Sequence, residues 1–508
     1  MEITGKNFIG DKLSGFGKVN YNTIDPLKNI ENDILFVEAT SEELEEAVAL
    51  ADLAFPIYRE LSGAQRASFL NAIADEILNL GDALIDIYCR ETGLPQGRAM
   101  GERGRTIFQL QLFAKTIETE DWRKNIIEAA IPERTPVPKP SLSKTHLPLG
   151  PIAVFGASNF PLAYSTAGGD TASALAAGCP VIVKSHPKHS GTGAMVSAAI
   201  IKAAQKTGMP NGVFSNLNSK SYALSHELVK HPQIKAVGFT GSFSGGSALN
   251  ESVLKRRHPI PFFAEMGSIN PIAITAGALE KGTQQMAQKI AGSIVLGAGQ
   301  FCTQPGLLLT VDEAHTDQFI VELTKVLKGL GQQCMINPEL KKNYFRQSDK
   351  INRLEKSIEI LSHKAQWDNQ FVEPKLSVIS ADQFIAYPEF QEEVFGPFSL
   401  LVKCKNLKEI ERLVFNLKGQ LTGSIFAPKT HYKSILPLIQ VFKSKVGRLL
   451  FNDVPTGVEV TAAMTHGGPY PASSDSRFTA VGPGSIYRWL RPITFQNWPK
   501  ELLKKIIN

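Results

Sequence analysis

The sequence predicts an α/β protein built on two parallel β-sheets, and three observations support this fold class. The chain has 508 residues, which is too long for a single hydrophobic core. Short apolar runs alternate with helical stretches from Ile152 onward, in two successive series. Hydrophobic residues make up 43% of the chain and charged residues 20%, the balance of an ordinary globular protein. We therefore expect two sheet domains and a smaller additional element.

The region before the first strand series is predicted to be largely helical. Thr40 and Glu43 form a capping-box pattern that opens an amphipathic helix, and further helices are expected near 64–80 and 100–118. Residues 125–147 contain four prolines, so this stretch cannot be a helix. It is expected to be an extended connector, and one interpretation is an edge strand used in assembly.

The first series has four apolar runs, each followed by a helical stretch, and this alternation predicts a buried parallel sheet of the dinucleotide-binding type. The runs are 152–155, 181–184, 213–217 and 236–240. No GxGxxG motif occurs in these units, so the usual dinucleotide fingerprint is absent.

The second series predicts a separate domain. Its expected elements are a strand at 271–275, a helix near 280–296, a strand at 306–311 and a helix from about residue 315. After Phe451 the chain is rich in Gly, Pro, Thr and Ser, which predicts loops and a terminal segment.

Composition narrows the class of protein. The first residues carry no secretory signal and no stretch has the roughly 18 apolar residues of a membrane span. The five cysteines are odd in number and form no CxxC, which favours a reducing cytoplasm and no zinc ribbon. The longest basic cluster, Lys255–His258, is short and lacks aromatics, so no nucleic-acid partner is expected. No metal site is predicted either.

Four short stretches carry groups suited to chemistry, although each has a plainer interpretation. Cys302 follows a glycine-rich turn, where an exposed thiolate could react. The plainer interpretation is a small buried residue. Glu265 enters a turn at a strand end, where burial would make it a general base; alone, it is better explained as a surface carboxylate. Asn159 offers an oxyanion donor or a turn amide. Gly241-Ser242 opens a helix that suits a phosphate or a plain turn.

Taken together, the order FGASNFP, VKSHP, FTGSFSGG, AEMGSINP, GQFCT and EEVFGP resembles the aldehyde dehydrogenase superfamily over nearly the whole chain. The resemblance implies an aldehyde dehydrogenase-like fold with two Rossmann-type domains and a small oligomerisation element. It implies an enzyme in which Cys302 is the nucleophile that carries a thioester, Glu265 the general base and Asn159 the oxyanion donor. It further implies a homodimer or homotetramer.

The same resemblance implies where a nicotinamide cofactor binds. Lys184 matches the lysine that binds the adenosine ribose, and Gly241-Ser242 the pyrophosphate turn. Glu393 and Phe395 match the residues that hold the nicotinamide ribose and ring. The implied domains are 1–124 with 148–264 for the cofactor, 265–450 for catalysis, and 125–147 with 451–508 for assembly and tail.

One departure from the family pattern concerns the cofactor. The usual Lys-Pro-Ser-Glu is here Lys-Ser-His-Pro, so Pro187 replaces the glutamate that bridges the adenine ribose hydroxyls in members that prefer NAD. Loss of this carboxylate removes repulsion against a 2′-phosphate. His186, Lys188 and His189 lie nearby and offer positive charge or hydrogen bonds. NADP is therefore expected, with NAD as the other possibility.

A second departure concerns the substrate. AEMGSINP and the long tail 465–499 resemble a branch that contains 2-oxoglutarate semialdehyde dehydrogenases and NADP-linked dehydrogenases of long-chain aldehydes. The semialdehyde is expected, a broad aliphatic aldehyde dehydrogenase is the runner-up, and a catalytically silent binding protein is the alternative outside enzymes. A substrate carboxylate calls for an arginine, and Arg103, Arg105 and Arg488 are the candidates.

Overall fold

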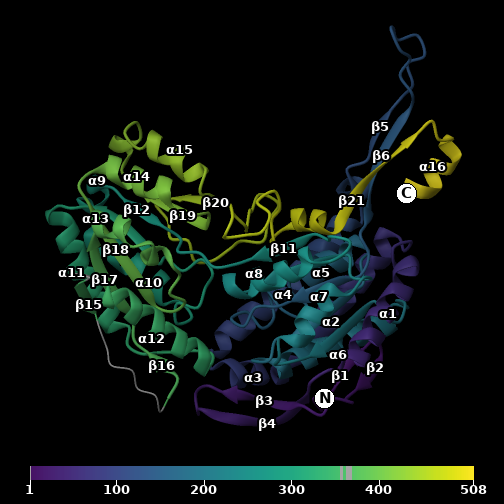
Figure 1. Ribbon diagram of the computed structural model, residues 1–508, viewed down its shortest axis with the longest axis horizontal. Helices are drawn as coiled ribbons and strands as arrows, with labels where there is room; N and C mark the ends of the chain where they lie inside the picture. Colours follow the sequence, from purple (N-terminus) through teal and green to yellow (C-terminus); the bar gives the residue numbers. More distant parts are fainter. Residues whose placement is uncertain (1, 355–357, 362–368, 508) are drawn as a thin grey trace.

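Two large sheets, each covered by helices on both faces, and a projecting arm make up the computed structural model (Figure 1). The structure describes residues 2–354, 358–361 and 369–507. None of the helices in this part of the chain combines the length and apolar character that crossing a bilayer requires.

The first sheet has seven strands in the order β11-β10-β7-β8-β9-β1-β2. The bounds are β11 Phe262–Glu265, β10 Ala236–Thr240, β7 Ile152–Phe155, β8 Val181–Ser185, β9 Phe214–Asn218, β1 Asn7–Ile9 and β2 Lys12–Ser14. β7 to β11 run parallel, as predicted, and their near-continuous burial explains the apolar runs. Thr240 pairs with Glu265, and Phe155 with Lys184, so these strands end at one edge.

Helices cover both faces of this sheet. One face packs on α2 Gly63–Asn79, α3 Gly81–Thr92, α4 Gln96–Ile117, α5 Gly169–Ala177 and α6 Ser190–Lys206. The other packs on α1 Ser41–Tyr58, α7 Ala223–Lys230 and α8 Phe243–Leu254. The predicted capping box of Thr40 and Glu43 is confirmed at the start of α1.

The N-terminal region also contains strands that the helical prediction missed. β1 pairs antiparallel with β9 and so extends the first sheet, while β3 Asn20–Asp25 and β4 Ile30–Val37 form a separate hairpin. These strands are short and alternate buried with exposed side chains, so they lack the apolar runs of the central strands.

The second sheet has the order β15-β17-β18-β13-β12-β19-β20, and only β15 runs antiparallel to its neighbour. The strands are β15 Ile358–Leu361, β17 Lys375–Ser380, β18 Phe398–Cys404, β13 Leu307–Val311, β12 Ile272–Ile274, β19 Gln420–Phe426 and β20 Val446–Phe451. The helices packed on it are α9 Ala276–Leu279, α10 Thr283–Val295, α11 Ala314–Gly329, α12 Pro338–Arg353, α13 Ala381–Ala386, α14 Leu407–Asn416 and α15 Leu436–Lys443. β14 Gln333–Cys334 and β16 Phe371–Val372 pair with each other in a separate two-stranded sheet, and α12 lies between them in the sequence.

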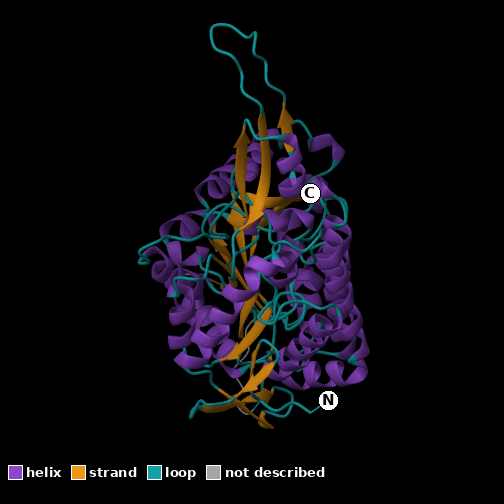
Figure 2. Ribbon diagram, turned by 90° about the vertical axis from the view of Figure 1, so that its right-hand side faces the viewer, coloured by secondary structure: helices purple, strands orange, loops and turns teal. Residues whose placement is uncertain are grey.

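The projecting arm is a three-stranded antiparallel sheet that joins distant parts of the chain (Figure 2). Its strands are β5 Ile126–Glu128, β6 Leu142–Pro148 and β21 Leu490–Gln496, and α16 Lys500–Ile507 follows β21. The predicted extended segment is confirmed: it supplies β5, which is an edge strand, and most of β6, which is central because β21 and β5 pair on its two sides. The role of the arm in assembly stays a prediction.

Candidate active site

Cys302 lies on a tight loop that follows α10. Gly297, Ala298 and Gly299 all have left-handed backbone conformations, with φ between 57° and 65°. A Cβ atom on Gly299 would lie 2.3 Å from the carbonyl carbon of Gly396, so only glycine fits there. This sharp change of direction ends the helix and turns the thiol toward the edge of the first sheet.

The side chain of Asn270 forms hydrogen bonds with the loop that carries Cys302. Its Nδ2 donates to the carbonyl oxygens of Cys302 and Gln304, both at 2.8 Å. Its Oδ1 accepts hydrogen bonds from the hydroxyls of Ser268 and Thr422, at 2.9 and 2.8 Å. The side chain is fully buried, so these bonds form away from water and hold the backbone of the predicted nucleophile in place.

Glu265 stands at the end of β11 and is enclosed by a later segment of the chain. Met266 N donates to Ala472 O at 2.8 Å, and Ser474 N donates to Ala264 O at 3.0 Å. Burial raises the pKa of Glu265 well above its usual value; nearby Arg488 opposes this shift and Asp170 adds to it. In the described residues, the buried Oε2 has no hydrogen-bond partner. This oxygen is available to a water molecule.

The structure brings the three predicted catalytic residues together. Asn159 Nδ2 donates to Gln300 O at 2.8 Å, which places this amide beside the Cys302 loop. Burial raises the pKa of the Cys302 thiol to about 12, and the charges of Glu265 and Glu393 add to the rise. The thiol therefore needs a nearby proton acceptor before it becomes a nucleophile.

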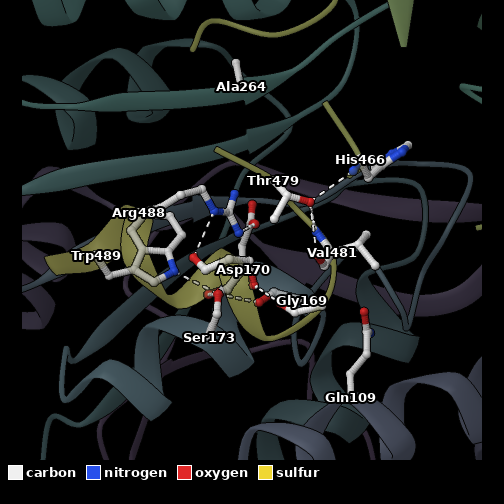
Figure 3. Close-up of polar contacts among 12 residues, drawn as sticks. Gln109, Gly169, Asp170, Ser173, Ala264, His466, Thr479, Val481, Arg488 and Trp489 are labelled. Carbon is white, nitrogen blue, oxygen red and sulfur yellow. Dashed lines mark hydrogen bonds and ion pairs between the residues drawn. The ribbon is translucent and has the colours of Figure 1, made fainter. Parts of the chain in front are cut away.

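His466 contacts the thiol and was not among the predicted site residues. Its Nε2 lies 3.6 Å from Cys302 Sγ. Burial, with the charges of Arg448 and Arg105, lowers its pKa to about 3, so the imidazole is neutral and too weak a base to take the thiol proton. In its Nε2–H tautomer it can donate a hydrogen bond to the Cys302 thiolate. Its backbone N donates to Thr479 Oγ1 at 3.0 Å (Figure 3). In the sequence, His466 lies in the tail 465–499 that resembles one branch of the family, but no motif there assigns it a role.

The three predicted substrate arginines lie in different surroundings. Arg105 Nη2 donates to Tyr164 OH at 3.1 Å, and the Tyr164 ring lies 5.9 Å from the His466 ring, so Arg105 belongs to the site. Arg103 lies on another face of α4 and donates to Gly81 O at 2.9 Å. The structure therefore does not bring Arg103 to the thiol.

Arg488 is committed to a buried structural pair. It bonds to Asp170 Oδ1 at 2.6 Å, and only 3% of its side chain is exposed. Its neighbour Trp489 donates from Nε1 to Ser173 Oγ at 2.7 Å in the same cluster (Figure 3). Arg488 therefore acts on the site through its charge, which opposes the raised pKa of Glu265, and does not face the substrate as a free donor.

The predicted ribose-binding residues follow β8. Burial lowers the pKa of Lys184 to about 8, and its Nζ makes no hydrogen bond within the described ranges, which suits a ligand rich in hydroxyl groups. Burial lowers the pKa of His186 well below its usual value, and its ring stacks on that of His189 at 5.0 Å. His186 is therefore neutral, contrary to the positive charge considered for it. Lys188 Nζ pairs with Glu339 at 2.5 Å.

The residues predicted to bind the pyrophosphate and the nicotinamide lie at the start of α8 and after η2 Pro388–Gln391. Ser242 caps α8 by accepting from Gly245 N at 3.2 Å, and the preceding Gly241 has no room for a side chain, since its Cβ would lie 2.7 Å from the Phe239 ring. Burial raises the pKa of Glu393 to about 7, and its Oε1 accepts from Ser268 N at 3.4 Å. Phe395 follows two residues later and is half-buried.

Comparison with known proteins identifies the class. Residues 12–473 match the aldehyde dehydrogenase family model, and the chain belongs to this family. It is therefore an NAD(P)-dependent aldehyde dehydrogenase, as the motifs predicted.

Two relatives align over almost their whole length. One is the alpha-ketoglutaric semialdehyde dehydrogenase 2 of Azospirillum brasilense, 44% identical over 99% of this chain and 96% of the relative. The other is the alpha-ketoglutaric semialdehyde dehydrogenase of Acinetobacter baylyi, 40% identical over 100% and 96%. A solved betaine aldehyde dehydrogenase of Staphylococcus aureus in complex with NAD+ has the same fold, with a TM-score of 0.84 at 19% identity, covering 98% of this chain and 96% of that one.

Proposed function

We propose that this enzyme oxidises 2-oxoglutarate semialdehyde to 2-oxoglutarate through a thioester on Cys302, and that it prefers NADP to NAD. One observation carries the chemistry. The thiol, a buried carboxylate oxygen without a partner and an amide donor meet at a single loop, although Glu265 and Asn159 lie far from Cys302 in sequence.

The residues divide the reaction between them. Cys302 gives up its proton to solvent and bonds as the thiolate to the aldehyde carbon, with His466 beside the sulfur as a hydrogen-bond donor. Asn159 with the Cys302 backbone N–H stabilises the resulting oxyanion. When bound, the nicotinamide supplies the acceptor for the hydride that leaves this carbon. Glu265 then takes a proton from water, whose oxygen attacks the thioester and releases the free acid with the thiol restored. Overall, aldehyde, water and NAD(P)+ give acid, NAD(P)H and a proton.

The substrate assignment rests on the two relatives, which are named for alpha-ketoglutaric semialdehyde and align with this chain from end to end. A substrate panel tests it. We expect the highest kcat/KM on 2-oxoglutarate semialdehyde, and lower values on succinate semialdehyde and on short and long aliphatic aldehydes. A higher kcat/KM on a long aliphatic aldehyde would instead favour the broad-specificity enzyme.

The NADP preference rests on Pro187, where a carboxylate would face a 2′-phosphate. Lys184 and Lys188 place positive charge at this end of β8, although Lys188 also forms an ion pair with Glu339. Pro187→Glu should lower the ratio of NADP to NAD efficiency by about tenfold or more, because a like charge opposes the phosphate. An unaltered ratio, or a strong NAD preference in the parent enzyme, would contradict the assignment.

We also propose the division of labour among the domains. The first sheet, with residues 1–124 and 148–264, binds the cofactor, and residues 265–450 carry the nucleophile. The arm and tail, 125–147 and 451–508, support a homodimer or homotetramer. Exposed Ile127 and Val137 on the arm favour burial in such a contact. Light scattering of a variant with both residues changed to Ser should show smaller particles.

A further inference from the structure

Two arginines near the thiol lack an acidic partner. Arg105 projects from α4 and uses Nη1 to donate to Val458 O and Nη2 to donate to Tyr164 OH. Its Nε is buried and has no hydrogen-bond partner in the part of the chain that the structure describes. A buried guanidinium N–H left without an acceptor is costly unless a ligand supplies one.

Arg448 lies on β20 and contacts the loop 455–458, to which Arg105 also bonds. It donates from Nη1 to Gly457 O at 2.7 Å and from Nη2 to Pro455 O. Asp453, the carboxylate whose charge acts on Arg448, pairs instead with Lys289 at 2.7 Å. Over residues 2–354, 358–361 and 369–507, no carboxylate forms an ion pair with Arg105 or Arg448, so neutral carbonyls and a phenol satisfy them only in part.

Both charges act on the imidazole that contacts the thiol. They are the charged neighbours that most strongly lower the pKa of His466, and this imidazole contacts Cys302 Sγ. Arg448 also counteracts the raised pKa of Cys302 itself. Two half-buried positive charges around the imidazole that contacts the nucleophile, neither in an ion pair within the described residues, favour an anionic ligand at this position.

We propose that Arg105 and Arg448 form a carboxylate subsite that holds the far end of the substrate while its aldehyde reaches Cys302. This inference rests on the proposed function, because 2-oxoglutarate semialdehyde carries its carboxylate at the end opposite the aldehyde. The free Nε of Arg105 and the remaining N–H groups of Arg448 are the donors. The subsite selects semialdehydes of keto acids over neutral aldehydes of the same length.

The experiment compares 2-oxoglutarate semialdehyde with pentanal, which has the same carbon number and no charge. Arg105→Gln and Arg448→Gln should each raise KM for the semialdehyde by about 30-fold or more, as loss of a desolvated charge partner does, and change KM for pentanal less than threefold. Arg103→Gln is the matched control, two residues from Arg105 on the same helix, and should change neither. Arg448→Lys, which keeps the charge, should recover part of the loss.

A second measurement uses the unaltered enzyme and does not depend on the folding of variants. 2-Oxopentanoate, the substrate with a methyl group in place of its aldehyde, should compete with pentanal, whereas 2-pentanone, which lacks the carboxylate, should not. Equal inhibition by the two compounds, or equal KM changes for both aldehydes in the glutamine variants, would overturn the subsite. Failure of the parent enzyme to oxidise either aldehyde would instead overturn the proposed function.

Discussion

Replacing Glu265 by glutamine should separate the two halves of the reaction. Glutamine has nearly the same shape, so no cavity forms, but it cannot accept the proton of the attacking water. Loss of a positioned general base costs about 100- to 10,000-fold in rate, which is about 2.7 to 5.5 kcal/mol in activation free energy. Thioester formation at Cys302, which His466 assists by hydrogen bonding to the sulfur, does not use this proton transfer and should proceed.

Stopped-flow absorbance of the reduced cofactor gives the assay. Glu265→Gln should show a burst of about one NAD(P)H per active site, followed by a steady state slowed by the factor above. Because burial raises the pKa of Glu265, the parent carboxyl is itself protonated at acid pH. The parent enzyme and the variant should therefore converge as pH falls and diverge as pH rises.

The same substitution has a signed effect on stability. A carboxyl whose pKa is raised on folding stabilises the protein at low pH, and this contribution is lost as pH rises through the raised pKa. The free energy of unfolding of Glu265→Gln should therefore increase relative to that of the parent as pH rises.

A parental steady-state rate in the variant, or loss of the burst itself, would refute the assignment of Glu265 to thioester hydrolysis.

Three further predictions concern the surroundings of the thiol. His466→Phe should slow alkylation of Cys302 by iodoacetamide about 10- to 100-fold, because the thiolate loses the hydrogen bond that His466 Nε2–H donates to it; an unchanged rate counts against that role. Asn270→Ala should lower the free energy of unfolding by about 3 kcal/mol or more, since four buried hydrogen bonds are lost, and urea denaturation measures this. Arg488→Met should cost about 3 to 5 kcal/mol by leaving Asp170 buried and unpaired. Adding Asp170→Asn should recover part of that loss, and no recovery would argue against the pair.

Local sequence patterns were enough to predict the central strands, whereas the catalytic groups were predicted from the family resemblance of several motifs taken together. The runs at β7, β8 and β10 are uninterrupted apolar segments because both faces of those strands are buried. The same topology brings strand ends to one edge, which is why Glu265 and the turn after β7 meet there.

The parts that were missed depend on contacts between distant residues. Arg488 carries no sign in its own neighbourhood that Asp170, 318 positions earlier, neutralises it. His466 lies in a segment of loops and reaches Cys302 across 164 positions. Arg448 is a lone arginine on a strand, and only the return of the following loop gives it carbonyl partners. No local periodicity encodes such pairings.

The enclosure of Glu265 by residues 472–474 bears on how the enzyme is made. Because synthesis runs from the N-terminus, all strands of the first sheet and Cys302 are made before residues 472–474. The carboxyl at the end of β11 then remains open to solvent, because the hydrogen bonds of Met266 and Ser474 are missing. In a chain cut short before residue 472 we expect the pKa of Glu265 to fall back toward its usual value, because the burial that raises it is lost.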